Sequence, residues 1–177
     1  MKYYLGIDGG GTKTVVAVFD ENGKILMKKT GRSINFYSVG METARKNLGF
    51  VIDEISNELK VDIFSGVFIG CSALDGEADG KLTADLCDGV INAEKIKIHS
   101  DVYIALRSVG DADCPCAAIC GTGSMAIAQD TDGNTHIAGG WGHIIGDEGS
   151  AYAIALNALK KCLNILTKSS LQKLLNF

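Results

Sequence analysis

Proline, basic clusters and long apolar runs are nearly or wholly absent from this chain. One proline stands against 22 glycines in 177 residues, which predicts an α/β protein with tight turns near ligands rather than disordered linkers. No apolar run approaches the roughly 20 residues of a membrane-spanning helix, so no membrane partner is expected. A formal charge of −4 without a Lys/Arg cluster argues against a nucleic-acid partner.

Cys-x-x-Cys pairs and the residue pattern of a signal peptide are not found either. None of the six cysteines forms a Cys-x-x-Cys pair, and the N-terminus enters an apolar strand directly. A cytoplasmic protein with reduced thiols is therefore expected. Cys114, Cys116 and Cys120 cluster, but their spacing is poor for metal ligands. Buried cysteine is a common core residue, so a core role is favoured over a metal or iron–sulfur role.

A glycine-rich stretch near the N-terminus organises the chain. Apolar runs flank it on both sides, which predicts strand–turn–strand. Consecutive glycines let backbone N–H groups approach a ligand closely, and the acid before them would need a hydrated Mg²⁺ to sit beside phosphate. The alternative is a hairpin whose glycines only make a tight turn. The stretch reads Leu5-Gly6-Ile7-Asp8-Gly9-Gly10-Gly11-Thr12-Lys13-Thr14.

Two better-known phosphate loops do not match this stretch. The spacing of Gly6 and Gly11 is close to that of the P-loop, but Thr12 stands where its lysine belongs. The P-loop and the dinucleotide fingerprint both lead into a helix, whereas residues 15–19 have the pattern of a strand. A phosphate hairpin with an acid at the end of its first strand resembles the superfamily of acetate and sugar kinases, heat-shock ATPases and actin. That resemblance implies a ribonuclease H-like, actin-like ATPase fold of the α/β class.

Hydrophobic periodicity predicts the order β-β-β-α-β-α-β-α over residues 1–112, with the first three strands as an antiparallel meander in a mixed sheet. Residues 31–36 are predicted to be a polar loop. Strands are predicted at residues 15–19, 25–29, 64–69, 96–99, 115–120, 125–129 and 136–138, besides the one that opens the chain, and helices at 41–59, 82–87, 100–109 and 151–166.

Residues 113–177 are expected to begin a second, related domain. Gly121-Thr122-Gly123 repeats the glycine-rich hairpin, and Asp132-Gly133-Asn134 repeats the earlier turn Glu21-Asn22-Gly23. Two such hairpins suit a nucleotide clasped between two sheets, although a plain turn is the alternative. Only the opening strands and one long helix of this second domain are present, so the chain is expected to be a fragment.

Two further stretches carry candidate chemistry. Asp101 follows the fifth predicted strand, and ligands bind at the carboxyl ends of strands in open α/β sheets. It can cap the following helix, accept a proton from a substrate hydroxyl during phosphoryl transfer, or do both. The stretch from Gly139 to Tyr152 is rich in glycine and runs into the start of a predicted helix. It contains an acidic pair, Asp147 and Glu148, shortly before that helix. That acidic pair can serve the helix dipole or hold sugar hydroxyls.

A family resemblance follows from these motifs. Together they are similar to the N-acetylglucosamine kinase branch of the BadF/BadG/BcrA/BcrD ATPase family, over nearly the whole chain. The resemblance implies ATP-dependent phosphoryl transfer from Mg-ATP to the primary hydroxyl of N-acetylglucosamine or a related amino sugar. The motifs are, in order, Asp8-Gly9-Gly10-Gly11-Thr12, Ser33-Ile34-Asn35, Asp101, Gly121-Thr122-Gly123-Ser124, and Gly140-Trp141-Gly142-His143 through Tyr152.

The resemblance also implies roles for single residues. Asp101 is the base on the sugar hydroxyl, and Asp8 serves the Mg²⁺. The nucleotide residues are Gly9, Gly10, Gly11, Thr12, Lys13, Gly121, Thr122 and Gly123. The sugar residues are Asn35, Ser124, Gly140, Trp141 and Asp147.

Two departures limit this expectation. Met125 stands where N-acetylglucosamine kinases can carry a polar residue, which leaves the exact sugar open. The adenosine-binding segment is expected beyond Phe177, so the fragment alone is expected to be inactive.

Two other functions stay open. One is an activator-type ATPase of the same family, which couples hydrolysis to electron transfer through a cysteine-held cluster. The other is a sugar or nucleotide sensor that has lost turnover. The expected partners are an amino sugar and ATP, and a homodimer of the full-length protein is left open.

Overall fold

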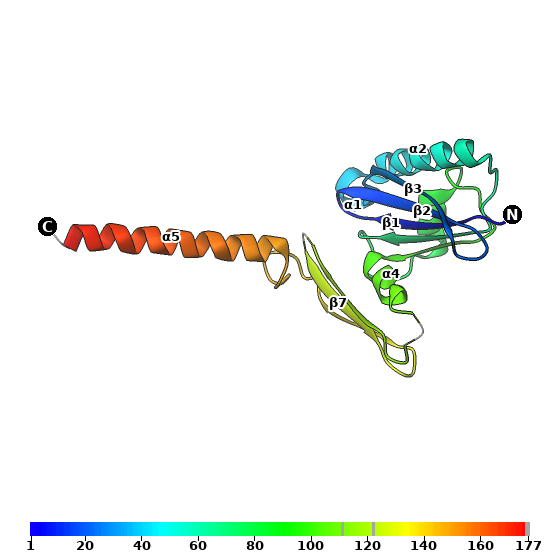
Figure 1. Cartoon of the computed structure of the whole chain (residues 1–177). Coiled ribbons are helices and arrows are strands. Elements are labelled where there is room, and N and C mark those ends of the chain that lie inside the picture. The colour runs from blue at the N-terminus through cyan, green and yellow to red at the C-terminus, as the bar shows by residue number, and fades with distance from the viewer. Residues whose placement is uncertain (111, 122, 176–177) are drawn as a thin grey trace. The chain divides into compact units, whose positions relative to one another are not determined.

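The chain divides into two compact units, Met1–Ser108 and Val109–Phe177, each with its own sheet (Figure 1). The structure, a computed structural model, describes residues 1–110, 112–121 and 123–175, and for residues 169–175 the backbone alone. Among these residues, no helix is both long and apolar enough to cross a membrane.

The first unit is built on a five-stranded mixed sheet in the order β3-β2-β1-β4-β5. β1, β2 and β3 form an antiparallel meander, as predicted, while β4 runs parallel to both β1 and β5. The carboxyl ends of β1, β4 and β5 therefore lie next to one another at one edge of the sheet. The strands are β1 (Tyr4–Gly9), β2 (Lys13–Phe19), β3 (Ile25–Arg32), β4 (Gly66–Cys71) and β5 (Ile96–Ser100).

Helices cover both faces of this sheet (Figure 1). The predicted helices are present, but the predicted loop at residues 31–36 runs into a helix, α1, that the sequence analysis missed. One helical turn is too short to show a 3.6-residue period, and its main signal is Asn35, whose side chain accepts the N–H of Ser38. The helices are α1 (Phe36–Val39), α2 (Met41–Leu59), α3 (Gly80–Cys87) and α4 (Asp101–Ser108).

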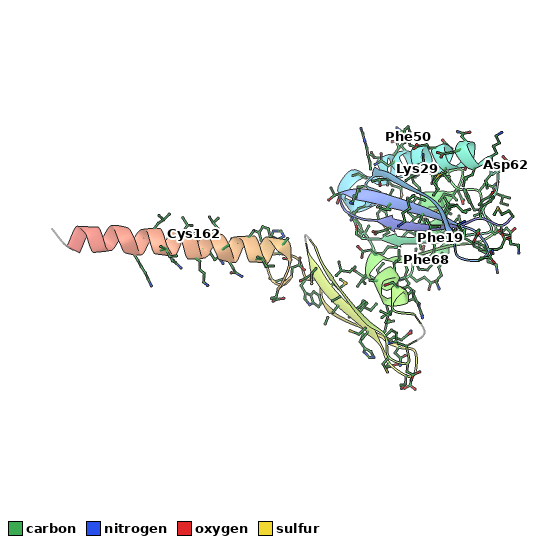
Figure 2. The ribbon with its side chains drawn as sticks, in the orientation of Figure 1. Phe19, Lys29, Phe50, Asp62, Phe68 and Cys162 are labelled. Atoms are coloured by element: carbon green, nitrogen blue, oxygen red, sulfur yellow. The ribbon has the colours of Figure 1, made fainter. Side chains whose placement is uncertain are left out.

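Successive side chains of β4 point to opposite faces of the sheet, and a different helix covers each face. Ile69 points into the apolar core that α2 closes, and its neighbour Phe68 points to the other face. There the Phe68 ring stacks on Tyr103 of α4, with ring centroids 6.2 Å apart. On the α2 side, Lys29 of β3 pairs with Glu54 and Glu58 at 2.9 and 2.7 Å. Figure 2 labels Phe68 and Lys29 on these opposite sides of the sheet.

The apolar core belongs to the first unit. Its buried members come from the sheet, α2, α3 and the segments that join them, and every one lies between residues 5 and 98. Ile7, Val16, Leu48, Ile55 and Ile69 are among its fully buried side chains. At about 25 cal/mol per Å² of buried apolar area, such side chains supply the main driving force for folding this unit.

The second unit contains a three-stranded antiparallel sheet and a long helix. Its strands are β6 (Cys116–Cys120), β7 (Ser124–Gln129) and β8 (Thr135–Gly139), in that order in the sheet. The helix α5 (Ala151–Leu175) continues past the predicted end at residue 166. Ile154, Leu159 and Leu163 on this helix are 63%, 56% and 53% exposed, so much of its apolar surface faces solvent.

The two meanders share the turn between their second and third strands. In each turn an aspartate, Asp20 or Asp130, accepts through Oδ1 the N–H groups two and four residues later, at 2.8 to 3.0 Å. The glycine three residues after it, Gly23 or Gly133, has a φ of 78° or 85°, a conformation that favours glycine. The two turns therefore have the same hydrogen-bond pattern, with Gly23 corresponding to Gly133. The repeat of a whole domain stays a prediction.

The predicted core role of the clustered cysteines is wrong. Cys71 and Cys87 are buried, whereas Cys114, Cys116 and Cys120 are exposed. The last two lie on alternate residues of β6 and so share one face, as the sequence predicted, but that face is the exposed one. In the part of the chain that the structure describes, no group of three or more His, Cys, Asp or Glu side chains could hold a metal ion.

Candidate active site

The hairpin between β1 and β2 carries the first set of predicted residues. The Gly10 N–H donates to the Lys13 carbonyl at 3.0 Å and closes the turn. A Cβ on Gly9 would lie 2.6 Å from two side-chain carbons of Ile34, so packing alone already requires glycine there. A Cβ on Gly11 would meet no atom within 4 Å, and Thr12 is exposed beside it. The tip of the hairpin is therefore open to a ligand.

Asp8 and Asp101 approach each other across Gly70. Asp8 lies opposite Gly70 in the parallel pairing of β1 with β4, on the face that α4 covers. A Cβ on Gly70 would lie 3.1 Å from the Asp101 Cα and would overlap the side chain of Ile104. The first turn of α4 thus rests directly on the backbone of β4, which brings the two carboxylates to the same end of the sheet.

The surroundings of Asp101 change its acidity. Burial raises the pKa of its carboxyl, and the negative charge of Asp8 raises it further. Hydrogen bonds from the backbone N–H groups of Val102 and of Asp101 itself oppose this rise. A carboxylate with a raised pKa is a stronger base, and perturbed carboxyl groups of this kind are frequent at functional sites.

Asn35 lies close to the same hairpin. Its Oδ1 accepts the Ser38 N–H at 3.1 Å, and its Nδ2 donates to the Ser72 Oγ at 3.0 Å. The neighbouring Ser33 donates its hydroxyl to the Gly10 carbonyl at 2.8 Å. The loop that was predicted to bind sugar is therefore hydrogen-bonded both to the hairpin between β1 and β2 and to the segment after β4.

The second hairpin lies against Asp147 within the second unit. The Gly121 N–H donates to the Gly123 carbonyl at 2.9 Å. Thr122, which was predicted to bind the nucleotide, lies outside the described residues. Asp147 is buried and has a φ of 62°, which is unusual for a residue with a side chain. Its Oδ2 lies 2.9 Å from the place where a Gly123 Cβ would stand. Glycine at 123 is what admits this carboxylate.

The glycine-rich loop that follows β8 is tied to the same hairpin. The Gly140 N–H donates to the Ser124 carbonyl at 2.9 Å, and the Ser124 hydroxyl donates to the Glu148 carbonyl at 2.9 Å. Gly140 has a φ of 77°, and a Cβ there would overlap the Met125 side chain. Trp141 is 74% exposed. The structure thus joins Ser124, Gly140 and Asp147 into one cluster, with Trp141 at its surface.

Sequence reasoning missed two residues of the first cluster, Gly70 and Ser72. Gly70 lets α4 approach β4, and Ser72 accepts a hydrogen bond from Asn35. The only sequence signal was a run of small residues, 70–73, directly after a buried strand. Such a run permits close approach at the carboxyl end of the strand without showing what approaches.

Residues 5–166 match the family model for the BadF/BadG/BcrA/BcrD ATPase family. The chain belongs to this family. The predicted family membership is therefore confirmed.

Curated relatives of this family member include sugar kinases. The chain is 33% identical over 170 residues to the N-acetylmuramic acid/N-acetylglucosamine kinase of Clostridium acetobutylicum, covering 95% of this chain and 56% of the relative. It is 30% identical over 171 residues to the N-acetyl-D-glucosamine kinase of Dictyostelium discoideum, covering 90% of this chain and 54% of the relative. The chain spans about half the length of the curated relatives it matches.

Solved structures agree on the fold. A protein of Porphyromonas gingivalis provisionally named an N-acetylglucosamine kinase aligns with a TM-score of 0.69 at 23% identity, over 85% of this chain and 52% of its own. A protein of Chromobacterium violaceum with the same provisional name gives 0.68 at 22% identity, over 85% and 53%. This family member has the mixed α/β fold of the actin-like ATPases, as the sequence predicted.

Proposed function

We propose that the whole protein is an ATP-dependent kinase that phosphorylates the primary hydroxyl of N-acetylglucosamine or a closely related amino sugar. The observation that carries the proposal is the pair of carboxylates, Asp8 and Asp101, at the carboxyl ends of β1 and β5, the two strands that run parallel to β4 on either side of it, beside an open glycine hairpin. The names of the curated relatives support the substrate class.

The residues of the first hairpin fit Mg-ATP. Asp8 is exposed at the strand end, and the backbone at Gly11 is open to an approaching phosphate. A hydrated Mg²⁺, when bound, neutralises phosphate charge and removes the repulsion between phosphate and the Asp8 carboxylate. Thr12 and Lys13 supply a hydroxyl and a cation at the hairpin tip.

Asp101 is the proposed base. A primary alcohol is a poor nucleophile at neutral pH, and a carboxylate within hydrogen-bond reach can take its proton as the phosphoryl group moves. The raised pKa of Asp101 strengthens it as a base. Asp147, held beside the second hairpin, is proposed to accept hydrogen bonds from sugar hydroxyls, and Asn35 to donate one.

The test is a screen of the full-length protein against amino sugars with Mg-ATP, following ADP release and the sugar phosphate separately. We expect ADP and sugar 6-phosphate in equal amounts with at least one N-acetylated amino sugar. ADP release that is independent of every sugar would overturn the proposal in favour of an activator-type ATPase. Sugar binding by calorimetry without any turnover would instead favour a sensor.

A further inference from the structure

A closed ring of hydrogen bonds links the phosphate hairpin to Asn35. The Ser33 hydroxyl donates to the Gly10 carbonyl at 2.8 Å and accepts the Asn35 N–H at 3.1 Å. The Asn35 side chain then donates to the Ser72 hydroxyl at 3.0 Å, and the Ser72 N–H returns to the Gly9 carbonyl at 2.9 Å. Two serine hydroxyls thus connect three separate segments of the chain.

The N–H of Ser38, which lies outside this ring, fixes which way the Asn35 amide faces. Its oxygen accepts from the N–H of Ser38, so an exchanged amide would place its NH₂ group against another donor. With Oδ1 fixed by Ser38, one N–H of the amide is committed to the Ser72 hydroxyl. The second N–H has no protein acceptor among the described residues, and it is the donor that the amide can offer to a ligand.

We propose that Ser33 and Ser72 are positioning residues: Ser33 holds the Asn35 backbone through its N–H, and Ser72 holds the side-chain amide that binds sugar in register with the phosphate hairpin. The inference rests on the proposed function, in which Asn35 contacts the sugar. Neither serine needs to touch substrate for this role. Both act through Asn35, and the carbonyls of Gly9 and Gly10 anchor the arrangement to the nucleotide side.

Ser72 gives the cleaner variant of the two. Ser33 is buried, and its hydroxyl both donates and accepts, so Ser33→Ala leaves the Gly10 carbonyl and the Asn35 N–H without a partner. That variant can lose folding stability for reasons unrelated to sugar. In Ser72→Ala the backbone bond from residue 72 to the Gly9 carbonyl remains, and only the acceptor for the Asn35 amide is lost.

Steady-state kinetics of the full-length protein test the role. For Ser72→Ala we expect the KM for the sugar to rise about 3- to 10-fold, with kcat and the KM for ATP within about twofold of the parent. Ser72→Thr keeps the hydroxyl and should restore the parent KM. Ser108→Ala is the control, because the Ser108 hydroxyl bonds only to the Ala105 carbonyl in its own helix.

A double-mutant cycle separates positioning from a plain structural effect. In an Asn35→Ala background, Ser72→Ala should raise the sugar KM no further, because the group that it positions is gone. Independent, multiplicative effects of the two substitutions would overturn the proposal. An equal rise in the KM values for sugar and ATP would do the same, since it would indicate general loosening of the site.

Exchange of the Asn35 side-chain amide provides a readout without catalysis, and it uses this chain as it stands. By NMR, one of the two amide protons should exchange with water at least several-fold more slowly than the other, and Ser72→Ala should remove the difference. An unchanged pattern in the variant would overturn the ring. If no sugar is phosphorylated, the proposed kinase function fails, while this measurement still decides whether Ser72 holds Asn35.

Discussion

The surroundings of Asp101 change the pKa of its carboxyl in opposite directions. Burial and the charge of Asp8 raise the pKa of its carboxyl, and the N–H groups at the start of α4 lower it, with the rise prevailing. Asp147 sits in a different environment, buried with a left-handed backbone and lying against Gly123. These two environments support the different roles that we propose for the two aspartates, proton transfer for Asp101 and binding of sugar hydroxyls for Asp147.

Conservative substitution of each aspartate should separate these tasks. Asp101→Asn keeps size and helix capping but loses the basic lone pair, so we expect turnover to fall by about two orders of magnitude or more, with sugar affinity within several-fold of the parent. Asp147→Asn should mainly weaken sugar binding. Steady-state kinetics and calorimetry on the full-length protein measure both effects. Normal turnover in Asp101→Asn would make Asp147 the candidate base.

The sequence predicted part of this site for a clear reason. Asp8 lies at the carboxyl end of β1 and Asp101 directly follows β5. Parallel strands bring their carboxyl ends together, so the proximity of the two residues follows from topology. The contact of Asn35 with Ser72 does not, because it joins residues 37 positions apart through side chains that carry no motif. The close fit of Gly123 to Asp147 is likewise a matter of tertiary packing.

At the level of single elements, the close packing of α4 on β4 depends on the absence of a side chain at Gly70. Gly70→Ala would place a Cβ 3.1 Å from the Asp101 Cα and into the side chain of Ile104. The helix must shift, and we expect a loss of about 1–3 kcal/mol in the free energy of unfolding. Because Asp101 moves with the helix, turnover should fall as well.

Gly76→Ala is the matched control for this prediction. A Cβ on Gly76 would meet no atom within 4 Å, and its φ is not positive, so it should be nearly neutral. Denaturant unfolding and kinetics of the two variants make the comparison. Equal stability of the two would mean that α4 does not rest on Gly70.

Elements were predictable from sequence where they were long and periodic. The helix at residues 41–59 was found because its apolar residues repeat over several helical turns. The first meander was found because apolar strand segments alternate with glycine-containing turns between the strands. The one-turn helix α1 was missed because four residues carry no period. The end of α5 was placed too early because four polar residues, 167–170, interrupt the apolar repeat, and the helix continues through them.

On the scale of the whole molecule, the first unit has a core of its own. Every buried member of the core cluster lies between residues 5 and 98, within the unit Met1–Ser108. We therefore expect residues 1–108 to fold alone with a cooperative thermal transition, within about 10 °C of that of the whole chain. Circular dichroism and gel filtration of this piece measure the outcome.

Residues 109–177 provide the contrast. Their long helix exposes Ile154, Leu159 and Leu163, so this piece should associate with itself or melt without a cooperative transition. A non-cooperative melt of residues 1–108 would contradict the prediction for the first unit. So would a cooperative, monomeric second piece beside an unfolded first one.

The self-contained core of the first unit also bears on how such a gene can change. A coding segment whose product closes its own core can be copied, fused or shortened without first passing through an unfolded protein. The matching turns at Asp20 and Asp130 are what the copying of such a segment would leave behind. After such copying, the second version would be free to accumulate changes in its helices and loops, while the first would continue to provide a folded product on which selection can act.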